Sequence, residues 1–295
     1  MRHSIPRPAR RPHRPRLVLL GALLMTAFPC FPAMAQSEAD VAANAGPTIG
    51  YARAADLVTG SSAIAIVRVR SLAPVSPDRA AGLPAGQVRY YVEAETTGLI
   101  RGNSAIARRV SFLLDLPAGN GRRPDFKKRS FLIFGQIGSR VDFFQLQSSS
   151  AMVDWSAANE ALVRKILADA LAPDSPPEIT GISSAFHVAG AIQGEGETQV
   201  FLGTANGSPI SLSIIRRPDE KPLLAAALGE VVDDTAGFPA PDTLLWYRLA
   251  CGLPRSLPAA AMDGLSLPDM DAARRDYAVF LEALGPCTRI GAPPS

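Results

Sequence analysis

Histidine and cysteine are scarce in this chain of 295 residues, and their scarcity excludes several kinds of site. Of three histidines, His3 and His13 lie in a basic N-terminal leader, so His187 is the one imidazole beyond it. A site that needs two or more histidines is therefore excluded there. A zinc site of the His/Cys type is disfavoured too, because one histidine and two distant cysteines fall short of four ligands. We expect no metal site and no cofactor.

Motifs typical of common enzymes are also missing. The sequence has no G-x-S-x-G nucleophile elbow, no Gly-Lys-Ser/Thr phosphate loop and no D-x-[DN]-x-[DN]-G calcium loop. What remains is His187, a weak catalytic candidate for which a partly exposed strand histidine is the favoured interpretation. Carboxylates in predicted loops, Glu195, Glu197 and the pair at 233–234, are further candidates for acid–base work. A hydrolase that uses His187 or these carboxylates is therefore kept as an alternative function.

The first 35 residues have the three parts of a secretory signal peptide. Six arginines without any acid precede an apolar run at 17–28, and the small residues Ala33-Met34-Ala35 follow, which predicts cleavage after Ala35. The apolar run is shorter than the roughly 20 residues that span a bilayer. A leader that stays as an anchor is the alternative. No later run reaches the length of a membrane span, so we expect none after processing and a periplasmic or secreted protein.

Removal of the leader reverses the net charge. The whole chain has 30 basic and 27 acidic residues; without the six leader arginines it has 24 and 27, a net charge of −3. This balance gives no support for binding to nucleic acid or to anionic membranes. One basic cluster stands out, and its members are weak candidates for binding an acidic partner: Arg122, Arg123, Lys127, Lys128 and Arg129. A solvated loop is the other interpretation of that cluster.

Two cysteines remain beyond the leader, Cys251 and Cys287. An exported protein with one such pair is expected to oxidise it. The first cysteine lies at the end of one predicted helix and the second just after another, so a disulfide would join the two helices. A redox-active pair is the alternative, although it usually requires C-x-x-C spacing.

The first half of the chain after the leader predicts strands separated by Gly/Pro-rich loops. Alternation is clear where Val88, Tyr90, Val92 and Ala94 interleave with polar partners. Five strands are expected, at 63–70, 88–95, 110–116, 130–134 and 141–147, which indicates a small antiparallel sheet or barrel. A helix is expected at 156–171, with Ser156 as its N-cap. The proline-rich segment that follows cannot continue a helix, so we place a domain boundary there, between domains at 51–172 and 178–295, after an arm at 36–50.

The second half predicts a β-hairpin and helices. Asn206-Gly207 favours a two-residue turn, in which Phe201 would face Leu212 on the buried side. We expect a weak helix at 223–232, a helix capped by Asp242, and a last helix that starts at Pro268 and stops at the glycine of Gly285-Pro286.

Several short motifs of the first half resemble netrin-like and tissue-inhibitor-like OB-barrel proteins. They are Ala55-Asp56-Leu57-Val58, Tyr90-Tyr91-Val92-Glu93, Leu99-Ile100-Arg101-Gly102, the segment 128–134 and Phe144-Gln145-Leu146. The resemblance covers residues 51–150 and implies an OB-like barrel, hence an α+β fold overall. Inhibitors of this type place an N-terminal cysteine against a protease metal, but residues 36–250 contain no cysteine. Protease inhibition is therefore not expected.

These observations lead to a hypothesis about function. We expect an exported, non-catalytic binding or interaction module, whose partner is an envelope protein or a small ligand not identified by the sequence. The alternatives are the hydrolase described above and a structural accessory that docks on an envelope assembly through the basic cluster.

Overall fold

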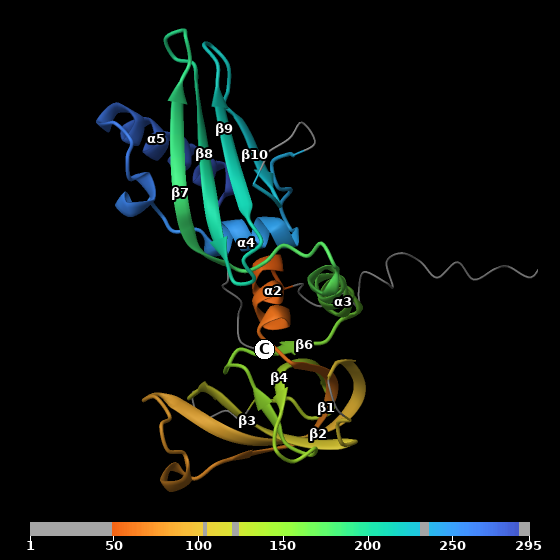
Figure 1. Ribbon diagram of the computed structural model, residues 1–295. Coiled ribbons are helices and arrows are strands. Elements are labelled where there is room, and N and C mark those ends of the chain that lie inside the picture. The colour runs from red at the N-terminus through yellow and green to blue at the C-terminus, as the bar shows by residue number, and fades with distance from the viewer. Residues whose placement is uncertain (1–48, 103–104, 120–123, 231–235, 289–295) are drawn as a thin grey trace, which may run out of the picture.

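The chain has an α+β fold with a β-barrel at one end, a second sheet at the other, helices between them and one helix behind the second sheet (Figure 1). The computed structural model describes residues 49–102, 105–119, 124–230 and 236–288. The predicted leader, most of the arm, and both Arg122 and Arg123 lie outside these ranges. Within them, no helix is both long and apolar enough to cross a membrane.

The first half forms the barrel and two of the helices. Its elements are α2 (Tyr51–Thr59), β1 (Ala63–Pro74), the short 3-10 helix η1 (Pro77–Arg79), β2 (Gln87–Arg101), β3 (Arg109–Pro117), β4 (Ser130–Ile137), β5 (Phe144–Leu146), β6 (Met152–Asp154) and α3 (Ala157–Leu171). The strand order is β3-β2-β1-β4-β5, and a parallel bridge between Ser111 and Phe143 brings the two ends of the sheet together. The result is a nearly closed, five-stranded, OB-like barrel, as predicted.

Side chains fill the interior of the barrel. On β2, Tyr90, Val92 and Ala94 point inward because successive residues of a strand alternate between its faces. Large aromatic residues from other segments, among them Phe112 and Phe131, complete this interior core and are fully buried. A barrel of this size is normally packed in this way. A ligand would therefore have to contact the outside of the barrel.

The second half is a four-stranded antiparallel sheet backed by helices. Its elements are β7 (Ile179–Ala189), β8 (Gly196–Thr204), β9 (Ile210–Arg216), β10 (Leu223–Ala227), α4 (Leu244–Gly252), the 3-10 helix η2 (Ala259–Met262) and α5 (Leu267–Leu284). The strands lie in the order β10-β9-β8-β7. Val200 and Leu212 pair on the inner face, which packs against α4 and α5.

The helices between the two sheets share one core. Ala55 and Val58 of α2 pack with Ile166 of α3 and with Leu244 and Tyr247 of α4, and all five are buried. Residues on both sides of the proline-rich segment thus contribute to a single apolar cluster. Burial of such side chains stabilises the contact between the halves by roughly 1.5–3 kcal/mol for each large residue.

The predicted register of the hairpin is wrong by one residue. Phe201 pairs with Ser211, and Leu202 pairs with Ile210. Strand β8 ends at Thr204 and β9 begins at Ile210, so the connection is residues 205–209, in which only Gly207 has a positive φ, at 78°. A two-residue turn of type I′ would need two residues with positive φ, so a longer connection takes its place. The slip moves Phe201 to the outer face of the sheet.

The predicted helix at 223–232 is wrong as well. Leu223–Ala227 is strand β10, which pairs with β9 from Leu223 opposite Ile215 to Ala227 opposite Ser211. Alanine favours helices, but cross-strand pairing with a long neighbouring strand outweighs this weak local preference. The N-cap of α4 is Thr243, one residue after the predicted Asp242.

Two predicted helix caps are confirmed. The Ser156 side chain accepts a hydrogen bond from the backbone N–H of Asn159 at the start of α3. Helix α5 has Pro268 in its first turn and ends at Gly285, which has a φ of 73°. The first turn of a helix accepts proline and the position after its last turn favours glycine, so the sequence predicts these helix ends well.

Candidate functional site

A concave, charged surface lies on the outside of the barrel. It has a volume of about 710 Å³ and is lined by Arg70, Tyr91, Glu93, Glu95, Arg108, Arg109, Ser111 and Asp142. We term these eight residues the barrel groove. They come from β1, β2, the residues around the start of β3, and the loop between β4 and β5. The face of strands 2 and 3, together with that loop, is where OB folds commonly bind ligands.

The alternation of β2 and β3 aims these side chains outward. On β2 the outward series Tyr91, Glu93 and Glu95 is the opposite face of the buried series described above; the first two are exposed and Glu95 is half-buried. Glu93 pairs across the ladder with Ser111 of β3, and Glu95 with Arg109. Directly opposed residues of antiparallel strands lie about 4.5–5.5 Å apart at Cβ. The pleat of the barrel wall therefore gathers these polar groups on one surface.

Most charges of the groove are paired with an opposite charge. Glu95 accepts hydrogen bonds from Arg70 and from Arg108, the latter at 3.1 Å. The Ser71 hydroxyl donates to Glu93 at 2.6 Å. Hydrogen bonding to Arg140 lowers the pKa of Asp142. Exposed ion pairs of this kind contribute at most about 1 kcal/mol each, so a partner can exchange them for its own charges at little cost.

A second hollow, of about 360 Å³, continues along β3. Arg89 binds Asp115 there through two hydrogen bonds of 2.7 Å, and hydrogen bonding to Asp115 raises the pKa of Arg89. Tyr91 and Leu113 pair across the strands between the two hollows, and each is 40% exposed. The surface thus has an aromatic and apolar centre between two charged ends.

His187, the catalytic candidate, makes its side-chain contacts within the second half of the chain. Its side chain is 9% exposed, and its Nδ1 lies 2.9 Å from the Thr198 hydroxyl. That hydroxyl in turn donates to Asp276 at 2.5 Å, and Arg216 also pairs with Asp276. Thr198 and Asp276 are fully buried.

This cluster is unsuited to nucleophilic catalysis. A catalytic hydroxyl must give its proton to the histidine, but the Thr198 proton points to the carboxylate, and no substrate can reach the buried oxygen. The His187 ring also lies so close to Gly196 that a Cβ there would be 2.9 Å from its Cε1. The contacts instead join α5 to β7, β8 and β9. Sequence reasoning did not single out Asp276, which lies 78 residues from Thr198.

The other predicted candidates do not gather at one place. Glu197 accepts hydrogen bonds from Gln199 at 2.8 Å and from Ser213 at 3.3 Å on the outer face of the second sheet. The acidic pair at 233–234 lies outside the described residues. In the part of the chain that the structure describes, no group of three His, Cys, Asp or Glu residues could hold a metal ion.

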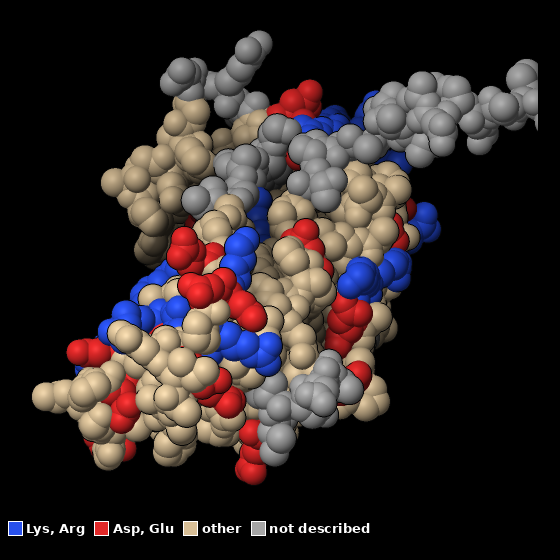
Figure 2. All heavy atoms as spheres, turned by 90° about the horizontal axis from the view of Figure 1, so that it is seen from above, with Lys and Arg blue, Asp and Glu red and all other residues tan. Residues whose placement is uncertain are grey.

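The described part of the basic cluster is only partly available to a partner. Arg129 pairs with Asp154 at 2.5 Å and lies over the rings of Phe126 and Phe131, at 5.8 and 5.3 Å from their centroids. Lys127 and Lys128 are exposed. On the face seen from above, Figure 2 shows basic and acidic side chains intermingled, not gathered into separate patches.

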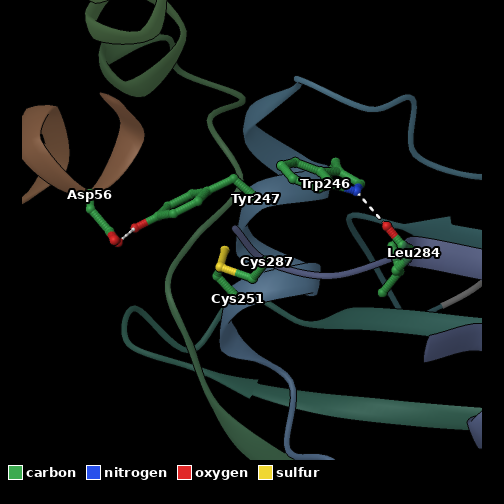
Figure 3. Close-up of a disulfide and its surroundings, with 6 residues drawn as sticks. All are labelled: Asp56, Trp246, Tyr247, Cys251, Leu284 and Cys287. Atoms are coloured by element: carbon green, nitrogen blue, oxygen red, sulfur yellow. Dashed lines mark hydrogen bonds between the residues drawn. A yellow bond between two sulfur atoms is a disulfide. The ribbon is translucent and has the colours of Figure 1, made fainter. Parts of the chain in front are cut away.

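The disulfide and its neighbours hold the helical layer together (Figure 3). Cys251 at the end of α4 is bonded to Cys287 with an S–S distance of 2.09 Å, as predicted. The indole N–H of Trp246 donates to the Leu284 carbonyl at 2.8 Å. Tyr247 donates to Asp56 of α2 at 2.5 Å, and burial, followed by this hydrogen bond, raises the pKa of Tyr247 to about 12.

A third hollow, of about 490 Å³, lies beside this contact, where α2 meets α4. Its two arginines already bind protein atoms. Arg53 donates to the Ser150 carbonyl at 2.8 Å, and Arg248 donates to the Pro176 carbonyl at 3.3 Å. We interpret these contacts as part of the junction between the halves. No protein-family model and no curated protein sequence matches the chain.

Proposed function

We propose that this protein is an exported, non-catalytic binding module that holds a partner protein of the cell envelope in the barrel groove. The observation that carries the proposal is the charged concave surface on the outside of a barrel whose interior is filled. The disulfide supports the exported location, because such bonds persist in oxidising compartments.

The chemistry of the groove favours recognition over catalysis. Its lining includes no histidine and no cysteine. A carboxylate that acts as a general acid needs a raised pKa, whereas hydrogen bonding to Arg140 lowers the pKa of Asp142. The Glu95 carboxylate is likewise occupied by Arg70 and Arg108. These groups are suited to charge-assisted hydrogen bonds with a partner.

The shape and composition of the surface favour a polypeptide as the ligand. Charges of both signs flank Tyr91 and Leu113, and interfaces between proteins typically have such an apolar centre with a polar rim. A single-stranded nucleic acid would require a basic track with several stacking aromatics. Two of the three groove arginines, Arg70 and Arg108, instead pair with the carboxylate of Glu95.

The test begins with immobilised protein and an envelope extract, followed by mass spectrometry of what is retained. A saturable partner is expected, and its affinity is then measured for Leu113→Ala and for Tyr91→Ala. Each variant should weaken binding by about tenfold, which corresponds to about 1.4 kcal/mol. Leu171→Ala is the matched control, because Leu171 is 67% exposed on α3, outside the groove.

Two results would contradict the proposal. One is a partner whose affinity is the same for Leu113→Ala and for Tyr91→Ala as for the unchanged protein. The other is turnover of a defined substrate by the pure protein.

A further inference from the structure

The hollow beside the contact of α2 with α4 is lined by both halves of the chain. The first half contributes residues of α2, Gly60 and the turn at 147–150, and the second contributes Glu178 and two residues of α4. We term this space the junction hollow. Apart from Leu57 and Gly60, the described residues that line it have polar side chains. Its volume of about 490 Å³ lies within the range of small-molecule sites, and its polar lining suits a charged ligand.

A nearly buried cation lies at the junction hollow. Arg53 of α2 lines it and is only 6% exposed. One terminal nitrogen of Arg53 donates to the Ser150 carbonyl at 2.8 Å, and burial lowers the pKa of Arg53. An apolar side chain of similar volume is often at least as stabilising as a buried charge. A guanidinium kept beside a hollow therefore indicates a role in binding as well as in packing.

A second arginine, Arg248 of α4, presents the rest of its guanidinium to the same hollow. Its Nε donates to the Pro176 carbonyl at 3.3 Å, and the group lies over the Tyr247 ring, 5.6 Å from the centroid. These two contacts fix the plane of the guanidinium. Among the residues that the structure describes, its two terminal nitrogens have no hydrogen-bond acceptor. The planar arrangement of such N–H groups matches the two oxygens of a carboxylate.

The acids of the lining restrict the charge of a ligand. Asp56 and Glu178 lie beside the two arginines, so the lining has no net charge. Tyr247 donates to Asp56, as Figure 3 shows, and Glu178 is exposed. A phosphate group has a charge near −2 and would meet repulsion from both acids. A carboxylate has a single negative charge, which suits the hollow better.

We propose that the junction hollow binds a carboxylate group, held by the guanidinium groups of Arg248 and Arg53. The Ser148 and Ser150 hydroxyls, 3.1 Å apart at the edge of the hollow, provide further donors. The carboxylate belongs to a small organic acid or to the C-terminus of a polypeptide, which present the same group. A bound carboxylate would connect α2 to α4 and so stabilise the contact between the halves. The junction hollow shares no residue with the barrel groove, so this site is independent of the function proposed above.

Nuclear magnetic resonance on the whole exported protein, labelled with ¹⁵N, tests the proposal without any variant. The protein is titrated with acetate, with N-acetyl-triglycine, with the C-terminal amide of that peptide and with inorganic phosphate. The two carboxylates should shift the backbone signals of residues 148–150 and Arg248 saturably, and leave those of Arg108 and Ser111 in the barrel groove in place. The peptide amide should shift none of them. Tighter binding of N-acetyl-triglycine than of acetate would assign the carboxylate to a polypeptide C-terminus, and the reverse order to a small acid.

Variants of Arg248 then test the role of its fork of donors. Arg248→Gln should weaken carboxylate binding at least about tenfold, because hydrogen bonds to a charged group are lost. Arg248→Lys keeps the charge without the planar fork and should restore only part of the affinity. Arg101→Gln is the matched control, since Arg101 is also half-buried and donates to a carbonyl, that of Val58 at 3.1 Å, outside the hollow.

Three results would overturn the proposal. The first is the absence of saturable shifts at residues 148–150, including the case in which only the signals of the barrel groove move. The second is binding of phosphate or of the peptide amide as tight as that of the carboxylates. The third is an affinity that Arg248→Gln leaves unaltered. None of these results bears on a partner protein in the barrel groove, which is tested by Leu113→Ala and Tyr91→Ala.

Discussion

Removal of the disulfide should cost about 3.8 kcal/mol of stability. The two cysteines are 36 residues apart. In the chain-entropy model, closing a loop of that length removes about 12.8 cal/mol/K from the unfolded chain, hence about 3.8 kcal/mol at 25 °C. For a protein of this size, each 1 kcal/mol shifts the melting temperature by about 2–4 °C, so the expected drop is roughly 8–15 °C.

The folded structure should survive that loss. The hydrogen bond from Trp246 to Leu284 still joins α4 to α5, and the ends of both helices remain packed in apolar clusters. The double variant Cys251→Ala/Cys287→Ala is preferred to serine because it leaves no hydroxyl in need of a partner. Both proteins are compared without the 35-residue leader, so no third thiol can exchange with the pair.

Urea unfolding and thermal melting of the two proteins, each with and without reductant, measure the effect. Reductant should destabilise the protein that has the pair and leave the double variant unchanged. A loss below about 1 kcal/mol would refute the reasoning, because it would mean that the unfolded chain gains little freedom when the bond is absent.

Three further changes test the remaining contacts. Asp276→Ala leaves Arg216 and His187 without their buried carboxylate, so urea unfolding should show a loss of about 3 kcal/mol in the free energy of unfolding. A loss under about 1 kcal/mol would contradict the view that these contacts hold α5 against the sheet. Gly207→Ala forces a side chain into a φ of 78° and should cost about 1 kcal/mol, while Gly181→Ala, whose Cβ meets open space, should cost little in the same assay. Burial raises the pKa of Tyr247 to about 12, against about 10 in the unfolded chain. Its contribution to the free energy of unfolding is therefore complete below about pH 10 and is lost as pH rises toward about 12. Tyr247→Phe should flatten that fall in unfolding free energy, and an unchanged slope would assign the fall to other groups.

Sequence patterns predicted the barrel because they report local geometry. Strict alternation on β2 and β3 fixes which side of each strand is buried, and the burial found in the structure follows it. Helix α3 is signalled by its cap and its apolar stripe. Signals of this kind depend only on the residues of the element itself, so they can be recognised without knowing which other elements pack against it.

The predictions failed where contacts with a neighbouring element determine the local structure. Ala205 belongs to the hairpin loop, although alanine is not a residue that marks a turn. This one extra loop residue shifts the pairing of β8 with β9 and so moves Phe201 from the core to the outer face. Strand β10 exists because β9 offers it a partner along its whole length. The candidate site depends on such pairings even more strongly. Glu95 meets Arg70 only through the pairing of β1 with β2, and Asp142 comes from a loop further along the chain.

The salt dependence of partner binding would separate the barrel groove from the basic cluster as the contact. A partner in the groove exchanges existing pairs such as Arg70–Glu95 for its own, so ion pairs are both broken and formed and their salt effects largely cancel. A partner docked on Lys127 and Lys128 would meet charge of one sign, and its affinity would fall steeply with added salt. We therefore expect affinity to change less than about threefold between low and physiological salt. A steep fall that Lys127→Ser/Lys128→Ser removes would transfer the contact to the basic cluster and leave the groove without its proposed role.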